Sequence, residues 1–309
     1  MDIVMLVIRQ IIIMCIYMAI GYTLFKTKKI TKEGSANMAT LLVWVIIPVV
    51  ITKSFCVEPT AQRIHAMAQS AIATALVLGA SLILSHVFFK KDPIANFGSS
   101  FCNAGFLGVP LVAATVGEYA VFYIAFFVAL LNIGQWVYGV SLITDKKMKL
   151  DLPTLLHPLM LSVAVGLLLF FTGWGAKLPA VITGTMTGIS GANAPLAMVV
   201  LGVYLAQADF KTLFTQARLY LISFVRLIMI PLVTLALLLG LKYLMPSMDH
   251  AIILALLLTA SAPVGANVAV YAQLHGKDYV YATKTVVNST LLSLLTMPLM
   301  VLLAQLLLK

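Results

Sequence analysis

The chain has 309 residues, of which 62% are hydrophobic and only 10% charged, and its 20 Lys and Arg residues outnumber its 10 Asp and Glu residues to give a net charge of +10. Soluble domains average about 45–50% apolar and about 25% charged residues, so this composition excludes a water-soluble fold. A transmembrane helix needs about 20 apolar residues, which leaves room for many helices and little else. We therefore expect an all-α integral membrane protein whose function resides among its helices.

Apolar runs between charged or turn-rich breaks predict ten transmembrane helices. In chain order these spans cover about residues 3–25, 37–56, 67–89, 94–115, 118–142, 154–173, 184–206, 219–241, 250–273 and 279–307.

The basic residues of the loops predict the orientation of the spans, because Lys and Arg are enriched in cytoplasmic loops. Alternate loops, beginning with the first, contain Lys26, Lys28, Lys29, Lys32, Lys90, Lys91, Lys146, Lys147, Lys149, Lys211, Arg218 and Lys277. The opposite loops and the C-terminus contain only Arg63, Lys177, Lys242 and Lys309. We expect a multi-pass protein of the cell (cytoplasmic) membrane with both termini outside the cytoplasm.

Charged residues inside the predicted spans are all basic. They are Arg9, Lys53, Arg226 and Lys284, whereas every Asp and Glu falls in a loop or at the end of a span. The interior therefore has no fixed negative charge, a property that suits an anionic substrate.

Five spans, a basic loop and five further spans indicate an inverted repeat, because an odd number of spans reverses the second half in the membrane. The expected repeats are residues 1–150 and 151–309. Similar landmarks recur in both halves, in the pairs Gly108 and Gly265, Asn132 and Asn288, and Pro48 and Pro195.

The fourth and ninth spans each contain a cluster of Gly, Pro and Asn that disfavours a continuous helix. Unwound backbone at membrane depth is tolerated only against protein or a water-filled cavity, and paired breaks in two repeats indicate a transporter binding site. The candidate substrate-binding residues are Asn103, Gly105, Gly108, Pro110, Ser261, Pro263, Gly265 and Asn267. The alternative is that these residues only kink packed helices, since Gly and Pro are common in transmembrane helices.

Three segments resemble the auxin efflux carrier family, which includes plant PIN-type auxin exporters and bacterial malonate and malate permeases. They are NAGFLGVP from Asn103, APLAM at Ala194–Met198 and SAPVGAN from Ser261. The resemblance covers essentially the whole chain, and the short central loop fits the bacterial branch best.

This resemblance implies the ten-helix fold of bile-acid symporters and sodium/proton antiporters, with helices four and nine crossing near mid-membrane. Helices 1, 2, 6 and 7 would form a scaffold, and helices 3–5 and 8–10 a core that moves as an elevator. The family's carboxylate-binding role falls on Asn103 with Pro110 and on Asn267 with Pro263. Cation antiport is disfavoured, because the antiporters of this fold depend on buried carboxylates that this chain lacks.

Other intramembrane polar residues have two interpretations. Lys284, Asn288, Asn132 and Arg226 are additional candidates for substrate binding, although Lys284 lies close enough to the end of its helix to snorkel and the asparagines can serve helix packing. Arg9 and Lys53 are expected to snorkel toward lipid headgroups. Gly184 and Gly188 form a GxxxG pattern that allows close helix contact and a homodimer through the scaffold.

These features predict a secondary transporter of small organic anions such as malonate or malate. The alternatives are an auxin-like monocarboxylate carrier, or an anion channel or receptor on the same fold. No Walker A, HExxH or GxSxG motif is present and the five histidines are scattered, so we expect no enzyme, cofactor or metal site. The expected partners are the carboxylate substrate and membrane lipid, and no nucleic acid.

Overall fold

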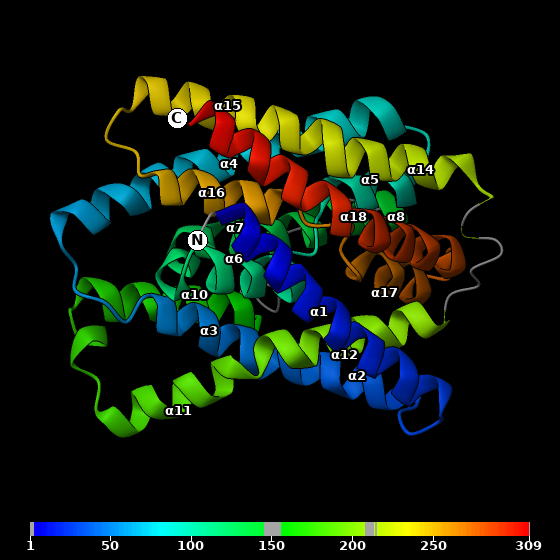
Figure 1. Cartoon of the computed structure of the whole chain (residues 1–309), viewed down its shortest axis with the longest axis horizontal. Coiled ribbons are helices and arrows are strands. Elements are labelled where there is room, and N and C mark those ends of the chain that lie inside the picture. Colours follow the sequence, from blue (N-terminus) through cyan, green and yellow to red (C-terminus); the bar gives the residue numbers. More distant parts are fainter. Residues whose placement is uncertain (1–2, 145–155, 208–212, 214, 309) are drawn as a thin grey trace.

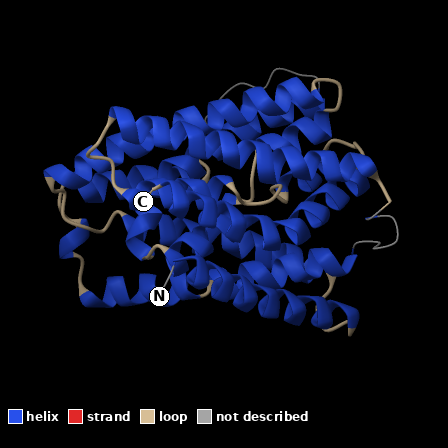
Figure 2. Ribbon diagram, turned by 45° about the horizontal axis from the view of Figure 1, so that its top comes forward, coloured by secondary structure: helices blue, strands red, loops and turns tan. Residues whose placement is uncertain are grey.

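The computed structural model describes residues 3–144, 156–207, 213 and 215–308. In this part of the chain the structure consists of helices joined by short loops, with no named strand (Figure 2). The expectation of an all-α protein is therefore confirmed.

The first half of the chain forms five helical units. Their elements are α1 (Ile3–Lys26); α2 (Lys32–Leu41), η1 (Leu42–Ile46) and α3 (Ile47–Ser54); α4 (Ala61–Phe89); α5 (Pro93–Ser100), η2 (Ala104–Gly108) and α6 (Val109–Thr115); and η3 (Glu118–Ala120), α7 (Val121–Gly134), η4 (Gln135–Gly139) and α8 (Val140–Thr144).

The second half repeats this pattern. Its elements are α10 (Pro158–Phe171); η5 (Gly175–Lys177), α11 (Ala180–Gly191) and α12 (Asn193–Gln207); α14 (Ala217–Phe224), η6 (Val225–Met229) and α15 (Ile230–Leu244); α16 (His250–Ala260) and α17 (Asn267–Leu274); and α18 (Tyr279–Leu307).

Within the described residues, seven helical stretches are long and apolar enough to cross a membrane. Three shorter apolar helices, Ala104–Thr115, Pro158–Phe171 and His250–Ala260, fall within the remaining predicted spans. Together these stretches follow the ten predicted spans in order. Two of the short helices belong to the fourth and ninth spans, which are the ones that the sequence predicts to be broken.

The two ends of the molecule differ in charge. The turns between α1 and α2, α4 and α5, and α17 and α18 lie at the right-hand end in Figure 1 and carry Lys28, Lys29, Lys90, Lys91 and Lys277; we call this the basic end. The turns between α3 and α4, α10 and α11, and α15 and α16 lie at the opposite end. Lys146, Lys147, Lys149 and Lys211, which the sequence assigns to the basic side, lie outside the described residues.

The helices pack in two groups. In the first group, α1 packs against α12, α2 packs against α12, and α3 packs against α10 and α11. In the second group, α4 packs against α5, α7 and α15, α18 packs against α14, α16 and α17, and η3 and α6 pack against α7 and α16. Figure 1 shows α2, α3, α11 and α12 along one side of the molecule and α4, α14 and α15 along the other. These groups contain the helices that the family resemblance assigns to a scaffold and to a core.

Glycines set the contact between α1 and α12. A Cβ atom at Gly21 would overlap the carbonyl oxygen of Val199, and one at Gly202 would overlap the carbonyl oxygen of Met18, so the two helices cross with their backbones touching. By contrast, an added Cβ at Gly184 or Gly188 meets nothing within 4 Å in the described structure. The GxxxG pattern on α11 therefore makes no close contact with the rest of the described chain.

Three of the π-helical turns end two residues before a proline. η1 leads into Pro48, η2 into Pro110 and η6 into Pro231. Proline lacks the N–H that would complete the preceding turn, and its ring clashes with the carbonyl oxygen four residues earlier. A wider π turn relieves that clash while the helix continues. These prolines therefore modify helices without ending them, whereas the breaks lie elsewhere.

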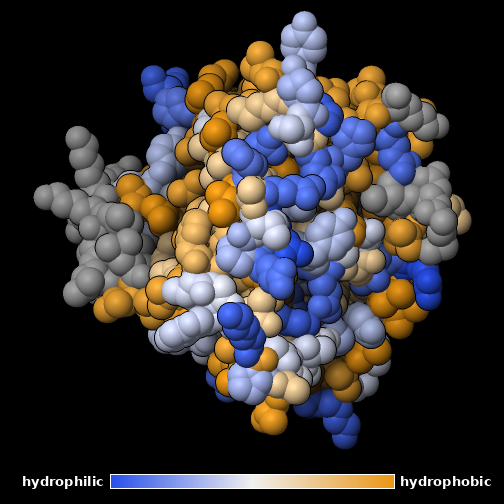
Figure 3. Space-filling model, turned by 90° about the vertical axis from the view of Figure 1, so that its left-hand side faces the viewer, coloured by the Kyte–Doolittle hydropathy of each residue, from blue (hydrophilic) through white to orange (hydrophobic). Residues whose placement is uncertain are grey.

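Large apolar side chains cover much of the outside of the described structure, among them Ile83, Leu168, Val181 and Leu295. Such a surface is too extensive for a monomer in water and suits lipid contact. Figure 3 shows the end of the molecule opposite the basic end, where polar side chains gather over the middle of the face and apolar side chains surround them.

Candidate functional site

The two broken helices cross at the centre of the molecule. α5 ends at Ser100 and the chain continues in extended conformation at Phe101, while α16 ends at Ala260. Cys102 and Val264 then form an isolated antiparallel bridge, in which the N–H of Asn103 donates to the carbonyl of Pro263 at 2.7 Å. The N–H of Gly265 donates to the carbonyl of Phe101 at 3.0 Å. Backbone groups that the breaks release thus satisfy each other, as burial in a membrane protein demands.

Glycines at both breaks allow this close crossing. A Cβ atom at Gly265 would lie 3.1 Å from the carbonyl oxygen of Cys102 and 3.2 Å from that of Phe101. One at Gly108 would lie 3.2 Å from the side-chain methyl of Thr259, and one at Gly105 would lie 3.1 Å from Ile47 Cδ1. At the second break a larger residue would therefore collide with backbone atoms, whereas at the first break it would come close to side chains.

Arg226 joins the ends of the two helices that enter the crossing. The residue is 1% exposed, and its Nη1 donates to the carbonyl of Ser99 at 3.1 Å while Nη2 donates to the carbonyl of Ala260. These carbonyls lie in the last turns of α5 and α16, where helix dipoles place partial negative charge. Nη1 also donates to Ser81 Oγ at 3.3 Å. One buried cation therefore caps two helix C-termini.

Polar groups at the crossing also remain available for a ligand. Asn103 caps η2 through Oδ1, which accepts from the N–H of Phe106 at 3.3 Å, and its buried Nδ2 has no hydrogen-bond partner among the described residues. The buried hydroxyl of Ser261 and Nε of Arg226 likewise lack a partner in this part of the chain. Buried polar groups are rarely left unpaired, so each of these three atoms has hydrogen-bonding capacity that the described protein groups do not use.

The other predicted asparagines have partners within the protein. Asn267 begins α17, and its Nδ2 donates to Gln135 Oε1 at 2.7 Å. Asn288 Oδ1 accepts from Ser223 Oγ at 2.8 Å, and Asn132 Nδ2 donates to the carbonyl of Val128, on its own helix, at 2.7 Å. Asn267 therefore lies at the crossing with its amide engaged, whereas Asn132 and Asn288 serve contacts within and between helices.

One cavity of about 470 Å³ separates α3 of the first group from α6 and η3 of the second. It is lined by Pro110 and Asn193, and its Lys53 Nζ forms an ion pair with Glu118 Oε2 at 2.8 Å. We call it the Lys53 cavity. Lys53 was expected to snorkel toward lipid, and the structure shows instead an ion pair between the two groups of helices.

A second cavity, of about 520 Å³, lies between α2 and α12 of the first group and α17 and α18 of the second. It begins among Lys32 and Tyr279 near the basic end and reaches Ala266, directly after the crossing. Lys284 also lines it, and we call it the Lys284 cavity. The two cavities therefore approach the broken helices from different ends.

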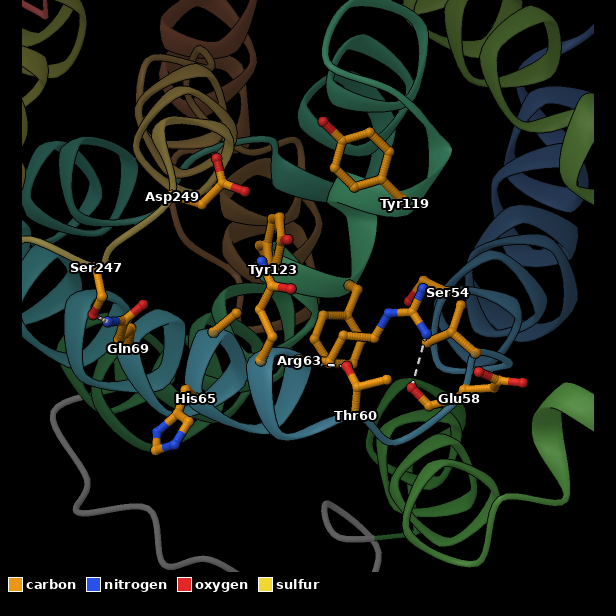
Figure 4. A pocket seen from close by; sticks show the side chains of 14 residues that line it. Ser54, Glu58, Thr60, Arg63, His65, Gln69, Tyr119, Tyr123, Ser247 and Asp249 are labelled. Atoms are coloured by element: carbon orange, nitrogen blue, oxygen red, sulfur yellow. Dashed lines mark hydrogen bonds between the residues drawn. The ribbon is translucent and has the colours of Figure 1, made fainter.

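A third cavity, of about 750 Å³, lies at the end opposite the basic end (Figure 4). Arg63 extends into it from α4, with Nη1 donating to the carbonyl of Glu58 at 2.8 Å, and Asp249 and Tyr119 lie across from Arg63. Gln69 Nε2 donates to Ser247 Oγ at 3.0 Å on another wall. This cavity contains charges of both signs, unlike the Lys284 cavity.

No Asp or Glu in the described part of the chain is buried, as the sequence predicts. Asp2, Asp145, Asp151 and Asp209 lie outside the described residues. Among the residues described, no group of three or more His, Cys, Asp or Glu side chains is arranged to hold a metal ion. The described interior thus contains a buried cation and no buried anion.

Several residues that shape the site were not among the predicted site residues. Gln135 holds Asn267, Ser81 and the carbonyl of Ser99 hold Arg226, and Ser289 Oγ accepts from the N–H of Val264 at 3.1 Å. Serine and glutamine in apolar spans were the only signal for them, and that signal does not identify partners more than 20 residues away in the sequence.

Comparison with known proteins identifies a family and a relative for this chain. A family model described as "Membrane transport protein" matches residues 6–154 and 152–301, one stretch in each half of the chain. A protein of Rhizobium meliloti named "Putative malonate transporter" is 24% identical over 294 residues, which cover 90% of this chain and 89% of the relative.

Proposed function

The chain belongs to the membrane transport protein family, that of the auxin efflux carriers, and from this we propose that it is a secondary carrier of small organic anions with malonate-like carboxylates as substrates. In this proposal a substrate carboxylate binds where α5 and α6 cross α16 and α17.

The unpaired donors at the crossing are the observation that carries this proposal. The buried Nδ2 of Asn103 and hydroxyl of Ser261 have no partner among the described residues, and a carboxylate oxygen accepts from both kinds of group. The guanidinium of Arg226, which donates to carbonyls at the ends of α5 and α16, adds positive charge and has no acidic partner among the described residues. A carboxylate here would gain charge-assisted hydrogen bonds, which are roughly twice as strong as neutral ones.

The name of the Rhizobium meliloti relative supports malonate as the first substrate to test. The charges agree with this choice, since the described residues bury no carboxylate that would repel a dianion.

The arrangement of the helices supports an elevator movement of the second group past the first. The Lys53 cavity and the Lys284 cavity both lie between the two groups; the first is lined by Pro110 of α6, and the second by Ala266, which follows Gly265 of the crossing. Paired breaks in an inverted repeat suit alternating access to one central site. With the basic end in the cytoplasm, as its lysines favour, the Lys284 cavity opens inward and both termini lie outside.

Uptake of labelled malonate into liposomes that contain the purified protein tests the proposal. We expect saturable uptake with counterflow, and Asn103→Ala should lower kcat/KM by about 10- to 100-fold, since hydrogen bonds to charged groups contribute about 1.5–3 kcal/mol. The matched control is Asn37→Ala, on an exposed position of α2.

Equal uptake by Asn103→Ala and by the wild-type protein would contradict the assignment of the site. Flux that does not saturate and shows single-channel currents would instead indicate an anion channel. Saturable uptake of an indole-type monocarboxylate with none of malonate would indicate an auxin-like carrier.

A further inference from the structure

Lys284 lies inside the membrane-spanning length of α18, about one and a half turns from its first residue, Tyr279. Its side chain is half-buried and has no ion-pair or hydrogen-bond partner in the described part of the chain. A lysine at such a depth is costly unless it meets water or an anion, so an unpaired one marks a functional position.

The cavity around Lys284 is suited to an anion. Its described lining includes Lys32 and Lys284 and no Asp or Glu, and uncharged polar groups come from Gln207, Gln273 and Thr283. Lys32 lies at the mouth, where its Nζ is 5.9 Å from the ring centre of Tyr279, and Lys284 lies deeper on the same wall as Tyr279. The positive charge thus continues from the surface into the cavity.

The same cavity reaches the crossing of the broken helices. Ala266, which lines it, follows Gly265, whose N–H bonds to Phe101 in the crossing. On the other wall, Val287 of α18 lines the cavity one turn beyond Lys284. The part of α18 that follows Lys284 thus leads to the crossing, where Ser289 Oγ accepts from the N–H of Val264 five residues, or about 7.5 Å, further along the helix.

We propose that Lys284 is a second anchoring residue, which binds the distal carboxylate of a dicarboxylate while the first carboxylate occupies the crossing. This inference rests on the proposed function and adds to it the reason why two carboxylates are preferred over one. A monocarboxylate fills the crossing but leaves Lys284 unpaired in a partly desolvated cavity, whereas a dicarboxylate satisfies both points.

Malonate and its monomethyl ester make a matched pair of ligands, because the ester keeps one carboxylate and nearly the same shape but loses the second charge. We expect wild-type protein to bind malonate about 10- to 100-fold more tightly than the ester, the range for one charge-assisted contact. Lys284→Met should abolish this preference by weakening malonate while leaving the ester within about threefold, and Lys284→Arg should keep the preference. Lys90→Met, exposed at the same end and not part of the cavity, is the control.

Isothermal calorimetry and liposome flux with both ligands separate the outcomes. If wild-type protein binds neither ligand, the proposed function fails. If it binds malonate and Lys284→Met weakens both ligands equally or neither, the role of Lys284 fails while the proposed function stands. An effect of Lys284→Met that requires phosphatidylglycerol in the liposomes would assign Lys284 to a lipid phosphate and overturn the inference.

Discussion

The Lys53 cavity and the Lys284 cavity have similar positions, but the lysine of the first is paired with a carboxylate and that of the second is not. Each lies between the two groups of helices, each is lined by the second part of a broken helix or the residue before it, and each contains one intramembrane lysine. Lys53 is paired with Glu118, whereas Lys284 has no partner among the described residues. An inverted repeat thus provides two similar approaches, and single side chains decide which of them offers a free positive charge to an anion.

The two breaks also differ in whether their asparagine amide group is hydrogen-bonded. At the first break, Asn103 uses Oδ1 to cap η2 and keeps Nδ2 unpaired within the described structure. At the second, the amide of Asn267 already donates to Gln135. The first break, whose helix lines the Lys53 cavity, therefore has the unpaired amide of Asn103. The second break, next to the Lys284 cavity, has the amide of Asn267, which is already hydrogen-bonded. A substrate with two carboxylates would use one group from each half.

Replacing Arg226 tests whether one side chain holds the ends of both broken helices together. It should have the largest effect on stability and transport. Arg226→Met leaves the carbonyls of Ser99 and Ala260 without their donor, and each unpaired buried group costs about 1–3 kcal/mol. We expect a loss of several degrees or more in the midpoint of thermal unfolding in detergent, and no transport from either side. Arg226→Lys keeps the charge with fewer donors and should recover part of the stability.

An Arg226→Met protein as stable as wild type would show that the helix ends need no cation. The crossing would then depend only on its backbone hydrogen bonds.

Gly265→Ala and Gly108→Ala compare the breaks directly and should differ in severity. The added methyl at residue 265 meets the backbone oxygens of Cys102 and Phe101, which cannot move without separating the crossing strands. At residue 108 the nearest atom is a side-chain methyl of Thr259 at 3.2 Å, and the nearest backbone atom, Thr259 Cα, lies at an ordinary contact distance of 3.5 Å. We expect about 1–3 kcal/mol of destabilisation for Gly265→Ala, as for overpacking in a core, and less than half of that for Gly108→Ala.

Chemical or thermal unfolding of both variants in the same detergent measures this difference. Equal losses would mean that the breaks are equally tight, and a larger loss for Gly108→Ala would reverse the comparison.

The sequence predicts the breaks well because their cause is local. Gly, Pro and Asn within eight residues disfavour a helix in any surroundings, so the two broken spans were located without knowledge of their neighbours. The position of the first break was less exact, because residues 104–115 are helical and the break lies at Phe101–Asn103. The ten spans follow for the same reason, since hydropathy is a property of a short window.

The roles of individual polar residues depend on distant neighbours and were harder to predict. Arg226 donates to a carbonyl 127 residues away, and Asn267 donates to a side chain 132 residues away. Neither contact leaves a pattern in the chain. Lys53 was expected in lipid headgroups because its acidic partner, Glu118, lies 65 residues away at the start of another unit. Periodicity gives the helix face of such residues but not the element they meet.

Glu118→Gln should have the smallest effect of these changes. It tests the difference between the two cavities directly, because it should make the Lys53 cavity resemble the Lys284 cavity. Glu118 is 72% exposed, and exposed ion pairs contribute only about 0.2–1 kcal/mol, so stability should hardly change. Freeing Lys53 and removing a carboxylate should instead lower the KM for malonate from the opposite end by about two- to fivefold, and the gain should vanish in high salt. Glu58→Gln, exposed at the same end and without an ion pair in the described structure, is the control. A raised or unchanged KM for Glu118→Gln would mean that the charge state of Lys53 does not govern how an anion enters, and the difference between the two cavities would then have to lie in their shape.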